Sequence, residues 1–434
     1  MAVRRGQGGT LANAGVGGVP PNARDSAQMT PLRQPRPWST QLGVLWIGQA
    51  LTVMGASFVM PFMPLLLVST GVSGSAIALW TGAMATLTQT GMAVFSPIWG
   101  RLADMTGRKP MMVRAIFGAG VSTIAIALSP NVYVMAAMFF ARGALAGITS
   151  AGAALVTSMA PADRIAHSLG VLQSSLYIGS TAGPAIGAGL IPFFGVRTSF
   201  LLAGALQIVT AAAVAHYVEE RFVREDAVVR RGRSRGRRGL REAGVSGTVA
   251  VLLLLGLLAA ATSAGLGVTM TLRVRSLVTP MHFAVAVGII TMLQASGGAV
   301  SALMISRLGR RTGYRRVLVA SSVWAMLIFA TLFFVPSLLV IGLLASLTGL
   351  ALGAFVPAVN TLLGVVTPSQ MRAEVFGYGG TAFALGGLVA PITCTSLIAA
   401  TGDTAAPFVL LAALEMTMAL WAVRSLRRLD GVAR

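Results

Sequence analysis

The sequence has little charge, few acids and a single cysteine. Cys394 stands alone, so neither an intramolecular disulfide nor a thiolate metal cluster can form. Charged residues make up only 10% of the 434 positions, against about a quarter in soluble domains. The chain also lacks the GxxxxGK[ST] phosphate loop, the HExxH zinc pattern and a plausible Ser-His-Asp set. These absences argue against a soluble protein, an ATP-driven pump and an enzyme, and we expect no metal and no cofactor.

What the sequence has instead is long apolar segments. Hydrophobic residues make up 55% of the chain, and the mean hydropathy is +0.79. Two of the runs without a charge are 26 residues (Leu42–Leu67) and 25 residues (Ala76–Gly100) long, whereas about 20 helical residues cross a bilayer. Because the backbone must satisfy its own hydrogen bonds in lipid, such runs predict helices rather than open strands. The sequence therefore predicts an all-α membrane protein.

The apolar runs predict twelve transmembrane helices in two groups of six. The first group covers 42–67, 76–99, 111–129, 132–158, 168–190 and 198–218, and the second covers 246–270, 283–305, 317–335, 338–366, 375–399 and 407–423. The predicted parts of the chain are a disordered cytoplasmic N-terminal tail (1–40), a first six-helix bundle (41–218), a basic cytoplasmic linker (219–245), a second six-helix bundle (246–424) and a cytoplasmic C-terminal tail (425–434).

The formal net charge of +21 would suggest nucleic-acid binding in a soluble protein. With both termini placed in the cytoplasm, 29 of the 33 basic residues fall on the cytoplasmic side. Three of the others (Arg197, Arg273 and Arg275) fall on the opposite side, and Arg142 lies within a helix. This bias is what the positive-inside rule describes. We therefore attribute the charge to topology in the cytoplasmic (inner) membrane and expect no nucleic-acid partner.

The two groups of helices resemble each other in sequence. Three positions of the first group recur 207 residues later: Pro161, Gly170 and Pro184 match Pro368, Gly377 and Pro391. The segment 100–107 recurs at 306–313, an offset of 206. Agreement between separate segments is typical of an internal duplication, and an even number of helices in each copy makes the two bundles parallel and pseudo-symmetric.

The segment GRLADMTGRKP, residues 100–110, joins the second and third predicted helices on the cytoplasmic side. Its glycines favour a tight turn, and its aspartate can pair with a nearby arginine or face a helix N-terminus. The segment closely resembles the signature loop of the major facilitator superfamily. That resemblance implies a conformational latch, and an ordinary turn with anchoring charges is the alternative. The predicted latch residues are Gly100, Arg101, Asp104, Gly107 and Arg108.

Arg142 lies within the predicted helix 132–158, where insertion of a guanidinium costs roughly 3 kcal/mol. Its position resembles that of the arginine in the fourth helix of proton-coupled members of the superfamily, although Leu145 and Ala146 replace the usual Gln and Gly. The resemblance implies a role in proton coupling. A structural arginine bonded to helix carbonyls is the alternative.

The predicted helix 168–190 contains the small-residue sequence GSTAGPAIGA. Small residues let two helices approach closely, and the proline lets the helix bend. The segment is similar to the antiporter motif of drug exporters of the superfamily, which implies export, and plain helix packing is the alternative. The motif residues are Gly179, Gly183, Pro184 and Gly187.

Intramembrane acids are scarce in the predicted helices. Glu415, in the last one, is the single candidate carboxyl at mid-depth, so it is a candidate proton carrier, with a protonated structural glutamate as the alternative.

The superfamily resemblance also implies a cavity lined by helices 1, 4, 7 and 10, with contributions from helices 2, 5, 8 and 11. The polar and aromatic candidates there are Gln49, Phe58, Gln89, Gln173, Tyr177, Gln294, Asn360 and Tyr378. For each of them taken singly, helix packing is the favoured explanation, because Gln and Asn also bond neighbouring helices. Because no acid is among them, strong selection for a cationic drug is not predicted.

The resemblance covers almost all of residues 40–425, and it points to the bacterial twelve-helix drug/proton antiporter branch, the multidrug efflux transporters. It implies a monomeric secondary transporter in the lipid bilayer, with a small-molecule substrate and protons as partners. We therefore predict proton-coupled efflux of small amphipathic molecules or drugs by alternating access. Proton-coupled uptake of a metabolite or nutrient is the alternative, and a channel fits the duplicated halves less well.

Overall fold

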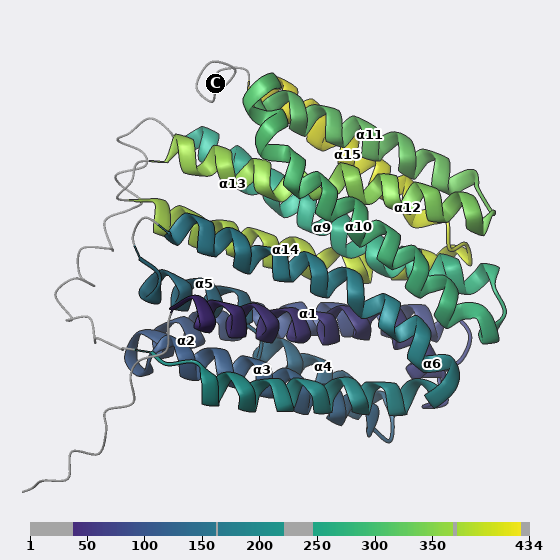
Figure 1. The fold of residues 1–434 in the computed structure, drawn as a ribbon. Helices are drawn as coiled ribbons and strands as arrows, with labels where there is room; N and C mark the ends of the chain where they lie inside the picture. Colours follow the sequence, from purple (N-terminus) through teal and green to yellow (C-terminus); the bar gives the residue numbers. More distant parts are fainter. Residues whose placement is uncertain (1–37, 162–163, 221–245, 368–370, 427–434) are drawn as a thin grey trace, which may run out of the picture. The chain divides into compact units, whose positions relative to one another are not determined.

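The computed structural model describes residues 38–161, 164–220, 246–367 and 371–426. The elements formed by these residues are all α-helices (Figure 1). This confirms the predicted all-α class. The predicted tails at 1–40 and 425–434 and the predicted linker at 219–245 lie almost wholly outside the described residues.

The helices of the first half are α1 (Trp38–Val68), α2 (Ala76–Thr106), α3 (Arg108–Ala127), α4 (Val132–Ala144), α5 (Ile148–Met159) and α6 (Ile165–Tyr217). The helices of the second half are α9 (Ser246–Leu277), α10 (Pro280–Thr312), α11 (Tyr314–Phe334), α12 (Leu338–Gly353), α13 (Phe355–Val366), α14 (Arg372–Thr401) and α15 (Ala406–Ser425).

Three predicted boundaries differ in the structure. The predicted helices 168–190 and 198–218 are joined in α6, where the non-helical Gly195 (φ 73°, ψ 164°) separates the two spans. The predicted helix 132–158 is interrupted between α4 and α5, before Gly147 at φ 125°. The predicted helix 338–366 is likewise interrupted between α12 and α13, at Ala354. Apolar runs identify the segments that lie in the membrane, but they do not show where the helix backbone bends or breaks.

Ten helical stretches among the described residues are long and apolar enough to cross a membrane. One of them is α6, which holds two spans on either side of Gly195. The 31-residue α2 is not one of the ten, and its sequence carries the polar residues Thr81, Thr86, Thr88 and Gln89. Adding α2 to these ten stretches, and counting α6 as two spans, gives the predicted twelve.

The two halves repeat one packing pattern. In the first half α1 packs on α6, α2 on α4, and α3 on α6. In the second half the corresponding pairs are α9 with α14, α10 with α12, and α11 with α15. The pattern supports the duplication that the sequence offsets indicate.

The halves meet along two helix pairs, α2 with α14 and α6 with α10. We call the end of the bundle where α1 begins and α15 ends the proximal end, and the end where α1 is followed by α2 the distal end (Figure 1). A Cβ built on Gly288 of α10 would lie 2.7 Å from the Pro184 carbonyl oxygen of α6, and Gly82 of α2 is in similarly close contact with Thr395 of α14. Both glycines lie near the distal ends of their helices, so the halves touch most closely on that side.

Candidate cavity and polar sites

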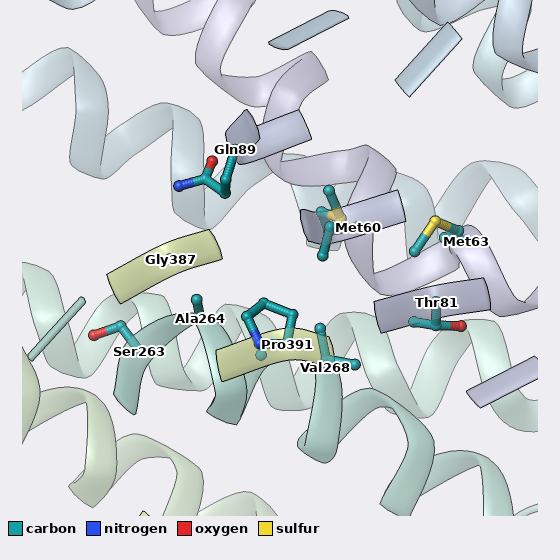
Figure 2. Close-up of a pocket in the computed structure, with 11 residues that line it drawn as sticks. Met60, Met63, Thr81, Gln89, Ser263, Ala264, Val268, Gly387 and Pro391 are labelled. Atoms are coloured by element: carbon teal, nitrogen blue, oxygen red, sulfur yellow. The ribbon is translucent and has the colours of Figure 1, made fainter. Parts of the chain in front are cut away.

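A cavity of ≈ 270 Å³ lies between the two halves (Figure 2). Residues of α1 and α2 form one wall, and residues of α9 and α14 form the other. The lining residues are Met60, Met63, Thr81, Ala85, Gln89, Ser263, Ala264, Gly267, Val268, Gly387 and Pro391.

The lining of this cavity carries no charged side chain. Its methionines are flexible and polarisable, so they adapt to apolar ligands of different shapes. The Thr81 hydroxyl already donates a hydrogen bond within its own helix, to the Ile77 carbonyl at 2.6 Å. Gln89 and Ser263 form no hydrogen bond with any other described residue. One free polar group from each half is therefore available to bind a ligand in a mostly apolar site.

Of the eight predicted cavity residues, Gln89 lines this cavity. Gln49 and Phe58 are buried within the first half, where Phe58 packs on the Phe200 ring at 4.9 Å. The other five are exposed or half-buried and lie outside the lining, so their contacts with substrate stay predictions: Gln173, Tyr177, Gln294, Asn360 and Tyr378. Helices 1, 2, 7 and 11 of the predicted series form the lining, and sequence reasoning did not single out Ser263 or the two methionines.

Arg142 is buried in the last turn of α4 and begins a chain of polar contacts across four helices. Its Nη1 donates to the Thr123 hydroxyl of α3 at 2.6 Å. That hydroxyl lies 3.3 Å from Oε1 of Gln207 in α6, whose amide nitrogen donates to the Thr52 carbonyl of α1 at 3.1 Å. Each of the three side chains is buried. The chain stays inside the first half and does not reach the lining of the cavity.

At the interruption between α4 and α5, two side chains donate hydrogen bonds to backbone carbonyls. The Trp99 indole nitrogen of α2 donates to the Ala144 carbonyl at 2.5 Å, and Arg114 Nη2 of α3 donates to the Ala146 carbonyl at 3.0 Å. The Arg114 guanidinium carbon lies 3.6 Å from the Trp99 ring centroid, a cation–π contact. Carbonyls at the end of a helix have no partner within it. These two donors therefore stabilise the break that precedes Gly147.

The start of α3 is capped by an acid that the sequence analysis did not identify. Both Glu220 oxygens accept from the backbone N–H of Arg108, at 2.8 and 2.9 Å, and Oε2 also accepts from the N–H of Lys109 at 2.8 Å. A carboxylate at a helix N-terminus satisfies free donors and the helix dipole. Arg108 Nη1 donates to the Ala154 carbonyl of α5 at 2.7 Å. The Asp104 side chain, predicted to fill this role, lies outside the described residues.

The remaining latch residues occupy a tight turn between α2 and α3. Gly107 has φ 101°, a conformation that favours glycine and agrees with the predicted turn. Gly100 has no atom within 4 Å of a built Cβ, and Arg101 is exposed. The turn geometry is thus present, and the latch itself stays a prediction.

The motif of small residues in α6 contacts both halves. At Gly179, Gly183 and Gly187 a built Cβ would lie within 3.0 Å of atoms of α1. On another side of the helix the Pro184 carbonyl faces Gly288 of α10. The predicted close approach is therefore present, and the same segment also forms the contact between the halves.

Glu415 is buried in α15, in the second half. The hydroxyls of Ser322 in α11 and Thr262 in α9 lie beside its carboxyl group. Neither forms a hydrogen bond of standard geometry with it, and all three groups are buried without another partner in the described chain. The group lies outside the lining of the cavity. It is a small polar site within the second half.

Two duplicated helical halves around an uncharged central cavity define a membrane transporter. The sequence profile of the Major Facilitator Superfamily matches residues 45–292 and 252–432. The chain belongs to this superfamily, and the family predicted from the sequence is thereby confirmed.

Two relatives carry names that refer to multidrug resistance, and one of these names describes an efflux pump. The multi-drug resistance efflux pump PmrA of Streptococcus pneumoniae is 31% identical over 362 residues, covering 82% of this chain and 88% of its own length. The multidrug resistance protein MdtG of Klebsiella pneumoniae is 29% identical over 393 residues, covering 90% of this chain and 94% of its own length.

The fold is also found among solved structures. The crystal structure of the nucleoside transporter NupG superposes with a TM-score of 0.73, covering 89% of this chain and 99% of that chain at 13% sequence identity. At this identity the likeness concerns the fold alone, and it agrees with the predicted arrangement of two six-helix bundles.

Proposed function

We propose that this protein exports small amphipathic molecules across the cytoplasmic membrane by alternating access, driven by protons. The observation that carries the proposal is the position of the cavity. Both halves line it, and the same halves touch at Gly82 and Gly288 toward the distal end. Separation of those contacts would open a path from the cavity to the distal side without unfolding either half. The relative named as a multidrug resistance efflux pump supports export as the direction.

The chemistry of the cavity supports an amphipathic substrate. A pocket of ≈ 270 Å³ with methionine and small apolar walls suits a compact apolar body. The Gln89 amide and the Ser263 hydroxyl offer one hydrogen-bonding group from each half. Since no charge lines the cavity, a neutral part of the substrate fits it best.

The topology that we propose follows the charge count. The proximal end, with both chain termini, faces the cytoplasm because 29 of the 33 basic residues were assigned to that side. A single chain supplies both walls of the cavity, so the monomer is the proposed functional unit.

Proton coupling is assigned to Arg142 and Glu415. Arg142 links four helices of the first half through Thr123 and Gln207, so a displacement of its guanidinium would alter hydrogen bonds that join all four helices. Glu415 is a buried carboxyl with two hydroxyls beside it and no basic partner among the described residues. A lone charge is costly in such a site, so the proton-bound form fits this packing.

Export is tested by dye accumulation in a host that lacks its own efflux pumps. Overexpression should lower accumulation of several chemically different dyes, and an uncoupler should restore it. Unchanged accumulation across the set would contradict efflux, and higher accumulation that is sensitive to the uncoupler would favour the uptake alternative.

The cavity is tested by comparing Gln89→Leu with Gln173→Leu. Loss of one neutral hydrogen bond, about 1 kcal/mol, should raise the KM for transport roughly five-fold in Gln89→Leu. Gln173 lies outside the lining and should tolerate the change. The reverse order of effects would move the binding site toward the proximal end.

Coupling is tested with Arg142→Ala. The variant should lose proton-driven transport while it still exchanges substrate across vesicles at equal pH on both sides. Wild-type uphill efflux would remove Arg142 from the coupling mechanism. For the latch, Asp104→Asn should slow transport and retain substrate binding, and an unchanged transport rate would show that the latch is unimportant.

A further inference from the structure

A second cavity, of ≈ 440 Å³, lies at the distal end of the molecule. The start of α2 forms its wall in the first half, and the ends of α9 and α14 form its wall in the second half. Its polar lining side chains are Ser75, Arg275, Ser276 and Thr404. It shares no lining residue with the central cavity.

The charge of Arg275 is unbalanced in this cavity. Its side chain is half-buried, and it has no hydrogen bond or ion pair with another described residue. Arg273, two residues earlier, is occupied: it donates to the Thr404 hydroxyl at 3.3 Å and to the Val335 carbonyl at 3.2 Å. The neighbouring acid, Asp403, lies 4.0 Å from Arg273 Nη1. Among the described residues, the acid beside the cavity is therefore associated with the other arginine.

The wall from the first half carries no charge. It consists of Gly74, Ser75, Ile77 and Ala78, of which only Ser75 has a polar side chain. The hollow thus combines an unpaired guanidinium from one half with a hydroxyl from the other. An anion held by Arg275 and Ser75 would connect the two halves directly.

We propose that this distal cavity binds a phosphate group attached to an organic body. A guanidinium group can bind phosphate through two parallel hydrogen bonds. The volume lies within the range of about 300–1,000 Å³ that is usual for organic ligands, so a bare ion would leave most of it unfilled. An anionic phospholipid and a soluble organic phosphate share this chemistry. Because the site has walls from both halves, the ligand stabilises the state in which their distal ends are close together.

The test measures binding by the purified protein and requires no transport, so its outcome is separate from that of the efflux proposal. Thermal unfolding is followed in detergent while either a short-chain phosphatidylglycerol or sn-glycerol 3-phosphate is titrated, at constant ionic strength. We expect saturable stabilisation of the wild type. Stabilisation by the lipid alone identifies a headgroup site, and stabilisation by both probes identifies a general phosphate site.

Two variants and a control make the test specific. Arg275→Gln should weaken the apparent affinity about tenfold or more, and Arg275→Lys should give an intermediate loss because lysine keeps the charge without the paired donors. Arg197→Gln is the matched control, since Arg197 is exposed at the same end and contacts Ser69 instead. If Arg275→Gln does not fold, the Arg275→Lys series decides alone. No stabilisation of the wild type by either probe, or equal affinities in wild type and Arg275 variants, overturns the proposal.

Discussion

Adding one methyl group at Gly288 should open the distal side of the protein. A Cβ at this position would lie 2.5 Å from the Ala188 Cβ and 2.7 Å from the Pro184 carbonyl oxygen. Both partners belong to α6, whose backbone cannot move away without moving the first half. Overpacking of this kind costs about 1–3 kcal/mol. The gain in helix propensity from Gly to Ala applies equally to both conformations, so it does not offset this cost.

The penalty falls on the conformation in which α6 and α10 touch. A change of about 1–3 kcal/mol corresponds to a shift of roughly 5- to 150-fold between two states. The shift can be read from the alkylation rate of a cysteine placed in the central cavity, with Ala264→Cys in a Cys394→Ala background. A membrane-impermeant maleimide is added on the distal side. We expect Gly288→Ala to raise the alkylation rate by a factor within that range.

The matched control is Gly43→Ala in α1, where a built Cβ has no atom within 4 Å. This variant adds the same methyl group to a helix without touching the other half, so its alkylation rate should equal that of the parent. If Gly288→Ala and Gly43→Ala react at the same rate, the contact between α6 and α10 does not close the distal side. That result would refute the reasoning from the glycine contacts.

Two further substitutions test the polar contacts of the first half. Glu220→Gln removes the charge that caps α3, which should lower the free energy of unfolding by about 0.5–2 kcal/mol and lower the unfolding temperature in detergent. The matched variant Glu219→Gln should leave the unfolding temperature unchanged. Equal losses in the two variants would mean that the cap contributes little. Trp99→Phe keeps an aromatic ring under Arg114 but leaves the Ala144 carbonyl without its donor, so the free energy of unfolding should fall by about 1–3 kcal/mol. In the same unfolding assay the control Trp324→Phe, on the exposed side of α11, should be near neutral.

The sequence predicted the helices and their duplication well because both depend on local properties. Apolar length places a segment in the membrane, and the offsets of 206 and 207 residues relate the two halves. The breaks before Gly147 and at Ala354 were not predicted. Hydropathy does not reveal the first of them, because α4 before the break and α5 after it are equally apolar. The cap on α3 was also missed, because Glu220 lies 112 residues from Arg108 in the chain.

The cavity was predicted less well than the helices for a related reason. In a soluble helix the apolar face marks the core, but a membrane helix is apolar on all sides, so its sequence does not tell which face meets another helix and which meets lipid. Gln89 was found because a polar side chain is conspicuous in α2. Met60 and Met63 were not, since nothing distinguishes a methionine in the lining from one against lipid until the helices are placed.

The polar character of α2 has a consequence for how the protein is made. This helix is not among the stretches apolar enough to cross a membrane by themselves, and it ends at Thr106, long before its partner in the other half, α14, is synthesised. In the finished protein the Thr86 hydroxyl donates to the Leu388 carbonyl of that helix, across an interval of 302 residues. Until then, α4 is the principal helix available to shield it. We therefore expect the first half to be less stable in the membrane when it is made without the second, because one face of α2 is covered by α14.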